Sequence, residues 1–429
     1  MSSWFDSYRE ALTKEMENEV LKVALERFTR TYWNSRNNAL RRLPYYNYYR
    51  KRVREVKTWS IAHIDELIKM VKENLEALGG TFYLANTAKD AAEYVAKVCS
   101  EHNAKLIVKS KSMVTEEISL NDVLISRGME VVETDLGEWI IQLRSEKPSH
   151  IIYPAIHLTR EEVAKTFSKV LGRELPSDPS ILVRVAREKL REKFINADVG
   201  ISGANAIAAD TSTIFVIENE GNARFSTNAP PVHICVSGIE KIVPTVEDAL
   251  LVSRVVTPNA TGQLMPVYIS LITGPSRTAD IELKLTLGVH GPKELYLVLV
   301  DNGRSKMIND PDFREAAYCV KCGACLSDCP IYREVGGIVW SYKYIGGIGA
   351  IWTYFAHGLD KAAPLAFTCT TCGRCKAICP LEIDTPSMIT KLRERLLKAG
   401  LVPQEVLTTI KNVKTVGNPF GITPFLSRW

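Results

Sequence analysis

The sequence predicts an α/β protein with a helical segment before its sheet and a cysteine-rich helical domain after it. Three observations support this. Apolar positions recur at helical spacing through the first 75 residues, short apolar strands alternate with amphipathic helices from about residue 80 to 303, and eight of the ten cysteines fall in two short C-terminal runs. We therefore expect a helical arm over 1–75, an α/β domain over 76–305, a cysteine-rich domain over 306–400 and a C-terminal tail over 401–429.

The composition is that of a globular protein. Apolar residues make up 46% of the 429 residues and charged residues 24%, which argues against disorder and against a membrane-embedded chain. The net charge of +5 is too small for this length to indicate nucleic-acid binding by itself, so we expect no nucleic-acid partner.

The N-terminus and the apolar stretches bear on localisation. The first turns are polar and acidic and lack a secretory signal, and the longest weakly polar stretch, 344–359, is broken by glycines and too short to span a membrane. We expect a cytoplasmic protein without a transmembrane segment, whose membrane association, where it occurs, is peripheral and through partners.

The first 75 residues are predicted to be helical, with a break at Pro44. Their basic residues alternate with tyrosines, a pattern that also fits contact with nucleic acid or anionic lipid. We favour a solvated helix face because acidic residues flank the run on both sides. The basic residues are Arg27, Arg30, Arg36, Arg41, Arg42, Arg50, Lys51, Arg52 and Arg54.

The central region alternates strands and helices, which is typical of a largely parallel sheet covered by helices. Its first half predicts strands over 81–85, 104–110 and 129–136, with a helix over 91–100 and another ending at Arg127. The second half predicts strands over 211–218, 231–238 and 294–301, with a helix over 246–256 between the last two.

The two cysteine runs repeat the spacing C-x2-C-x2-C-x3-C, and each is followed by proline. This is the signature of two-cluster ferredoxins, which hold two [4Fe-4S] clusters and whose fourth cysteine ligates the cluster of the other run. We therefore predict two crossed ligand sets. One cluster is assigned to Cys319, Cys322, Cys325 and Cys379, and the other to Cys369, Cys372, Cys375 and Cys329.

Zinc sites and disulfides are the alternatives to iron-sulfur clusters for these cysteines. Paired C-x2-C units also make zinc sites, but those use four thiolates in total, whereas this chain has two sets of four. Disulfides are disfavoured because cytosolic thiols stay reduced. Cys99 lies on an amphipathic helix and Cys235 in an apolar strand, so we interpret both as small core residues rather than catalytic thiols.

The segment between the runs, 331–367, is rich in aromatics and glycine. We interpret it as a hydrophobic loop that packs over the clusters. The alternative is an interface for a redox partner or a quinone, since exposed aromatic patches rarely lack a partner.

Beyond the cysteine runs, the chain resembles a known family, the iron-sulfur subunit of the lactate-utilisation system. The resemblance covers essentially the whole chain, with six dispersed blocks in the family's order followed by the ferredoxin-like repeat. The blocks are 109–121, 131–143, 148–157, 209–245, 271–282 and 299–305.

This resemblance implies an α/β lactate-utilisation domain, similar to the fold shared by sugar-phosphate isomerases and CoA transferases. Family members act beside a subunit with cysteine-rich CCG motifs, and together they oxidise L-lactate or a related 2-hydroxy acid and pass electrons to a quinone or another carrier. The tail 417–429 resembles the stretch that leads into the CCG domain in fused relatives, so we expect a separate CCG subunit to dock there.

A substrate pocket in the α/β domain is a further hypothesis. Gly200, Gly203, Asn205 and Asp210 form a turn before a strand, a position that often receives ligands. Basic and amide side chains nearby suit a carboxylate, although structural turns and solvated basic residues explain them equally well. The candidate residues are Lys109, Lys111, Asn205, Asp210, Asn222 and Arg224.

Three functional hypotheses follow. The first is an electron-transfer subunit of a complex that oxidises L-lactate or a related 2-hydroxy acid. The second is an adaptor without its own substrate in a heterodisulfide-reductase-like or respiratory assembly, because 369–384 also looks like the small iron-sulfur subunit of heterodisulfide reductases. The third is a purely structural role for the clusters.

Overall fold

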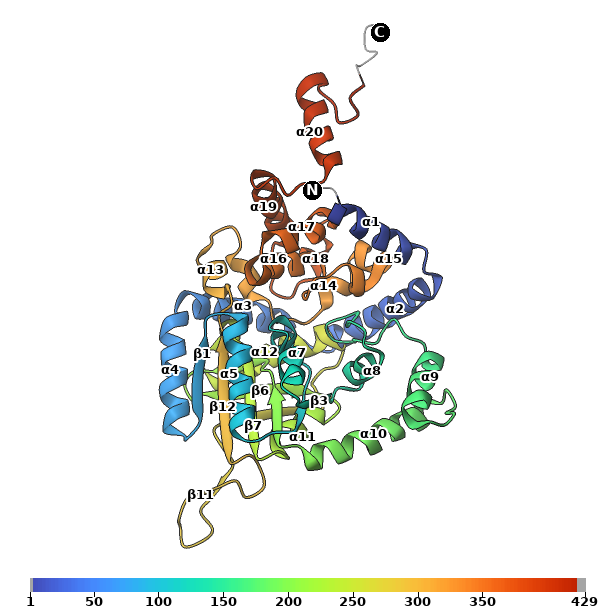
Figure 1. Cartoon of the computed structure of the whole chain (residues 1–429). Helices are drawn as coiled ribbons and strands as arrows, with labels where there is room; N and C mark the ends of the chain where they lie inside the picture. The colour runs from blue at the N-terminus through green and yellow to red at the C-terminus, as the bar shows by residue number, and fades with distance from the viewer. Residues whose placement is uncertain (1–2, 423–429) are drawn as a thin grey trace.

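A six-stranded, entirely parallel sheet forms the centre of the α/β region, in the order β1-β12-β7-β4-β2-β3 (Figure 1). The computed structural model describes residues 3–422. The strands are β1 (Thr81–Ala85), β2 (Leu106–Lys109), β3 (Glu130–Glu133), β4 (Val199–Ser202), β7 (Val232–Gly238) and β12 (Glu294–Val300).

The middle of this sheet is buried on both faces. Every residue of β7 is buried, and so is every residue of β4, its neighbour. Such strands read as continuous apolar runs because helices cover both faces of a parallel sheet. The predicted strands at 81–85, 104–110, 129–136, 231–238 and 294–301 each contain an observed strand.

A second, four-stranded sheet with the order β8-β5-β6-β9 lies beside the first. The neighbours β5 and β8 run parallel, and the other pairs are antiparallel. A small hairpin, β10 with β11, projects from the body at the bottom of Figure 1. The bounds are β5 (Ala206–Ala208), β6 (Thr213–Glu218), β8 (Ile242–Val243), β9 (Tyr268–Ile272), β10 (Arg277–Thr278) and β11 (Thr286–Leu287).

The helices of this region follow the predicted alternation with one difference. The helix predicted to end at Arg127 is two short helices, because Ser119 between them takes a left-handed conformation with φ 51°. The helices are α5 (Ala88–Glu101), α6 (Met113–Glu117), α7 (Leu120–Ser126), α8 (Leu136–Arg144), α9 (Arg160–Leu171), α10 (Pro179–Asn196), α11 (Asn222–Asn228), the 3-10 turn η1 (Ile239–Lys241) and α12 (Val246–Ala260).

The N-terminal segment is helical, as predicted, and its chain breaks around Pro44. It consists of α1 (Ser3–Met16), α2 (Glu19–Arg41), α3 (Tyr46–Ala62) and α4 (Ile64–Ala77). Asn18 caps α2 by accepting from the Leu21 N–H. These helices contribute Leu25, Val53 and Val71 to the same hydrophobic core as the second sheet and the cysteine-rich region, so they are an integral layer of the molecule.

The cysteine-rich region is helical. Its elements are α13 (Arg304–Asn309), the 3-10 helix η2 (Arg314–Tyr318), α14 (Ala324–Ser327), α15 (Pro330–Val339), α16 (Gly346–His357), α17 (Leu359–Thr368), α18 (Arg374–Ile378) and α19 (Thr385–Lys398). The segment 331–367 is therefore three helices rather than a loop. Its Trp340 and Trp352 are almost fully buried, which supports packing over the cysteines.

A last helix, α20 (Gln404–Val416), projects from the body beyond α19 (Figure 1). The sequence predicted an irregular tail there, but 404–416 forms a helix with no buried residue. Of the predicted docking tail, 423–429 lie outside the described residues. No helix among residues 3–422 is long and apolar enough to cross a membrane. The domain limits at 75, 305 and 400 stay predictions.

Candidate functional site

Each cysteine run forms the same local structure. Lys321 and the corresponding Thr371 take left-handed conformations with φ 58° and 52°, and the next residue but one in each run, Gly323 and Gly373, does the same with φ 77° and 84°. These left-handed residues curl each loop, so that the first three cysteines of each run line the same cavity. A short helix, α14 or α18, then carries the chain to the fourth cysteine.

Two adjacent cavities receive the eight cysteine side chains. We call them the first and the second cysteine cavity. The first is lined by Cys319, Cys322, Cys325, Cys375 and Cys379. The second is lined by Cys325, Cys329, Cys369, Cys372 and Cys375. Each cavity contains one complete crossed set, and Cys325 and Cys375 border both.

The chemistry of this donor set fits [4Fe-4S] clusters, which require four soft thiolates each. Burial and, after it, the neighbouring Cys379 thiol raise the pKa of Cys322 to about 12. Burial raises the pKa of Cys329 to about 12 as well, and Cys369 and Cys372 contribute to this rise. Cys379 of the second run is thus near the first run, and Cys329 is near the second. This proximity supports the crossed assignment, which stays a prediction.

Arginines of the N-terminal helices hold the backbone around Cys379. Arg36 donates from Nη2 to the Ile378 carbonyl at 3.3 Å, and Arg50 donates from Nη1 to the Pro380 carbonyl at 3.4 Å. Arg54 donates to the Leu381 carbonyl. The basic run, interpreted above as a solvated helix face, thus contains one buried and two half-buried arginines that bind inside the molecule.

A buried ion cluster lies between the sheet and the first cysteine run. Arg304 donates from Nη2 to Glu117 Oε2 at 2.8 Å and from Nε to Glu240 Oε2 at 2.6 Å. Burial opposes ionisation of Glu240, but Arg304 together with Lys241, Lys321 and Lys57 outweighs it, and the pKa of this carboxyl falls to about 2. Tyr344 also donates to Glu117. This cluster ties α6, η1 and α13 to the loop before α16.

A cavity of about 570 Å³ lies where the α/β region meets the first cysteine run, and we call it the main cavity. It is lined from the ends of β2, β3 and β4, from β6 and from the loop 151–156. Five residues line both the main cavity and the first cysteine cavity: Met113, Ile151, Val320, Lys321 and Tyr344. The two cavities are therefore adjacent, and these five residues form the wall that they share.

Three of the six predicted pocket residues line the main cavity, namely Lys111, Asn205 and Asn222. Asp210 does not line the main cavity and is exposed at the far end of β5. Arg224 does not line it either, because its guanidinium lies over the Tyr268 ring, 4.6 Å from the centroid.

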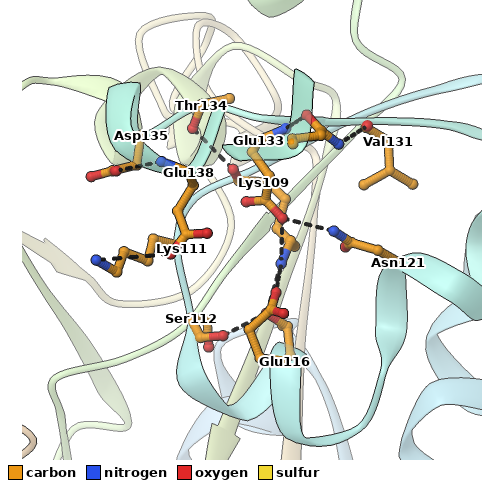
Figure 2. A network of polar contacts seen from close by, with 12 residues as sticks. Lys109, Lys111, Ser112, Glu116, Asn121, Val131, Glu133, Thr134, Asp135 and Glu138 are labelled. Carbon is orange, nitrogen blue, oxygen red and sulfur yellow. Dashed lines mark hydrogen bonds and ion pairs between the residues drawn. The ribbon is translucent and has the colours of Figure 1, made fainter. Parts of the chain in front are cut away.

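Lys109 lies beneath the cavity in a buried ion network (Figure 2). Its Nζ is 2.8 Å from Glu133 Oε1 and 3.0 Å from Glu116 Oε1. Figure 2 shows Lys111 on the other side of this network, reaching toward Glu138. Within a strand, side chains two residues apart lie on the same side of the sheet. Because β2 ends at Lys109, this rule does not extend to Lys111, and the two lysines point in different directions.

Close backbone approach explains two glycines of the predicted turn. A Cβ at Gly200 would meet the Ser226 carbonyl oxygen at 1.7 Å, and one at Gly203 would meet Ser112 Oγ at 2.7 Å. Gly203 lines the main cavity, so this contact brings Ser112 to its rim.

The sequence did not indicate six charged residues of the main cavity: Asp135, Glu218, Glu220, Glu240, Lys241 and Lys321. Burial, with the neighbouring Asp135, raises the pKa of Glu220 to about 7. Burial raises the pKa of Cys99 and of Cys235 to about 12. Neither of these thiols lines a cavity described here, in keeping with their interpretation as core residues.

This fold and donor set define a class, an iron-sulfur protein in which an α/β domain adjoins a two-cluster centre. Residues 68–300 match the model of the LUD domain family, and residues 315–383 match the 4Fe-4S dicluster domain. The chain binds two [4Fe-4S] clusters. It belongs to the lactate utilization protein B family.

Curated relatives match over nearly the whole chain. Lactate utilization protein B of Oceanobacillus iheyensis is 37% identical over 91% of this chain and 80% of its own length. The protein of that name from Bacillus subtilis is 35% identical over 99% and 87%. The uncharacterized electron transport protein YkgF of Escherichia coli is 33% identical over 94% and 83%.

Proposed function

We propose that this chain is the iron-sulfur subunit of an oxidoreductase that oxidises L-lactate or a related 2-hydroxy acid. When bound, its two clusters supply one-electron carriers between the substrate and a further acceptor, a quinone or another carrier. The observation that carries the proposal is the shared wall. The main cavity, large enough for an organic acid, and the first cysteine cavity share lining residues such as Val320 and Lys321.

The protein's own residues have definable tasks in this function. The two crossed cysteine sets would hold the clusters, and Arg36, Arg50 and Arg54 fix the backbone that bears Cys379. Buried tryptophans beside α15 and within α16 exclude water, Trp352 at the first cysteine cavity and Trp340 at the second. Exclusion of water and hydrogen bonding to the sulfurs are what the protein contributes to cluster potential.

The proposal includes a partner, a separate subunit with CCG motifs. Two features support a docking region at the end of the molecule that bears the second cysteine cavity. Cys372 is the one exposed cysteine among the eight. The projecting helix α20 also has no buried residue, although it carries Leu407, Ile410 and Val413. An electron acceptor would need such access to the cluster held in the second cysteine cavity.

The test is lactate-dependent dye reduction by the co-purified complex of this chain and its CCG partner. We expect reduction with L-lactate or another 2-hydroxy acid in the complex and none with either subunit alone. A complex with about eight irons in this subunit that responds to no 2-hydroxy acid would favour the adaptor function. A matched control is the same complex with Cys235→Ser, which alters a buried thiol far from the cysteine cavities and should stay active.

A further inference from the structure

Acidic side chains outnumber lysines in the lining of the main cavity, four to three, but the acidic groups already accept hydrogen bonds within the protein. Four acidic residues line it, and each carboxylate has a partner of its own. Glu240 binds Arg304 at 2.6 Å, and Glu218 accepts from the N–H groups of Ala223 and Arg224 at 2.7 and 2.9 Å. Asp135 and Glu220 accept from the N–H groups of Glu138 and Leu136, both at 3.1 Å.

Three lysines also line the cavity: Lys111, Lys241 and Lys321. The ammonium of Lys111 is buried and has no hydrogen-bond partner among the described residues. Its closest carboxylate, Glu138, is 3.8 Å away, beyond hydrogen-bond distance (Figure 2). A buried ammonium without a hydrogen-bond acceptor is costly, so an anionic oxygen from a ligand would stabilise Lys111.

Lys321 closes the opposite, cluster-facing side. Its Nζ lies 3.3 Å from the Trp352 ring centroid and 4.4 Å from that of Tyr344. Apolar side chains surround this end of the cavity, among them Met113, Ile151 and Val320. The lining shared with the first cysteine cavity is thus apolar except for Lys321 and Tyr344, and Lys111 is not part of it.

Asn205 adds a directed donor. Its Oδ1 accepts from the Ile217 N–H at 2.8 Å, so its amide nitrogen is the group that it can offer to a ligand oxygen. Lys111 and Asn205 both line the main cavity, and an ammonium together with an amide donor suits the carboxylate and the adjacent oxygen of a 2-oxo or 2-hydroxy acid.

We infer that the main cavity is the binding site for a 2-oxo or 2-hydroxy carboxylate, with the carboxylate held by Lys111 and the rest of the molecule directed toward the wall shared with the first cysteine cavity. This inference rests on the proposed function and deepens it, because it places the substrate in this subunit rather than in the partner. It concerns binding and needs no redox step.

The experiment uses the cluster-loaded full chain under anaerobic conditions and pyruvate, which binds as an acid but has no hydroxyl to oxidise. Calorimetry should show binding with one site per chain, and acetate should bind more weakly. Lys111→Met should weaken pyruvate binding by about 10- to 100-fold, the loss expected for a charge-assisted hydrogen bond. Lys111→Arg should restore part of it, and Lys147→Met, an exposed lysine outside the lining, should not change it.

A second variant guards against misfolding. Asn205→Asp keeps the acceptor for Ile217 but adds a negative charge, so it should weaken pyruvate binding while iron content stays at the wild-type level. Pyruvate should also alter the electron paramagnetic resonance signal of one reduced cluster and leave the other unchanged. Unchanged affinity in both Lys111→Met and Asn205→Asp would overturn the inference.

The two proposals fail in different ways. If the chain binds no pyruvate, alone or with its partner, but the complex still reduces a dye with L-lactate, the substrate site lies in the partner and only this inference fails. If the chain binds pyruvate as expected but no 2-hydroxy acid drives reduction, the cavity stands and the proposed function fails.

Discussion

The two cysteine runs have the same spacing but different surroundings. The first run packs against the α/β region, where Cys322 is buried and Lys321 lies over Trp352. The second run lies at the surface, where Cys372 is exposed and a Cβ at Gly373 would meet nothing within 4 Å. At the position of Lys321 the second run has Thr371.

This difference shows that the repeated motif determines which residues are ligands, whereas the neighbouring elements determine the surroundings of each cysteine run. The first cysteine cavity shares a wall with the main cavity, whereas the second shares none with it. We therefore distinguish an inner site that faces the α/β region from an outer site that faces solvent or a partner.

The largest expected effect is on stability. Arg304→Met leaves Glu117 and Glu240 buried without the guanidinium that pairs with both, which should cost about 3–5 kcal/mol of unfolding free energy. On the outer side, Arg374→Ala breaks a pair with Asp328 in which the arginine side chain is 50% exposed, and it should cost at most about 1 kcal/mol. Anaerobic urea unfolding measures both. Equal losses would contradict the distinction between a buried inner side and a solvated outer side.

A smaller effect concerns cluster potential. Lys321→Thr removes a positive charge beside the inner site and should lower the potential of one cluster by on the order of 100 mV, the value for a unit charge at about 6 Å in a partly buried setting. Thr371→Lys places a cation beside the outer site, where solvent screens it, and should raise the other potential by less. Potentiometric titration followed by electron paramagnetic resonance resolves the two clusters. If either variant shifted the potentials of both clusters, the distinction between the inner and the outer site would be contradicted.

The smallest expected effect is a pH dependence of ligand binding at the inner side. Burial raises the pKa of Glu138 to about 8 against the influence of Lys111, and the carboxylates of Glu133, Glu116 and Asp135 raise it further. Below pH 8 Glu138 is neutral and leaves Lys111 to the ligand, while above pH 8 its ionised form competes for Lys111. Pyruvate affinity should therefore fall severalfold as pH rises through 8. Glu138→Gln should flatten this profile, and an unchanged slope in that variant would refute the explanation.

The cysteine ligands and most strands could be predicted from the sequence because each depends on a local pattern. Thiol spacing follows the geometry of one loop, and buried parallel strands appear as continuous apolar runs such as 231–238. The main cavity was predicted only in part. Lys111, Asn205 and Asn222 line it, but Lys241 and Lys321 reach it from distant segments, which no local pattern can reveal.

The N-terminal arginines illustrate the same limit. The sequence indicated a solvated basic face, because flanking acidic residues are the only local information. In the structure, Arg36 binds Asn259 and the Ile378 carbonyl, which are more than 200 residues away. Helix α20 was missed for another reason, since its threonines and lysines leave a weak apolar stripe and it buries nothing.

The most direct test of the crossed inner and outer sites compares Cys379→Ser with Cys329→Ser. Each variant, loaded anaerobically and reduced with dithionite, is examined by electron paramagnetic resonance. We predict that Cys379→Ser alters the inner cluster, the one whose signal responds to Lys321→Thr, and that Cys329→Ser alters the outer cluster, the one that responds to Thr371→Lys. The reverse pattern, with each fourth cysteine affecting the cluster of its own run, would contradict the account.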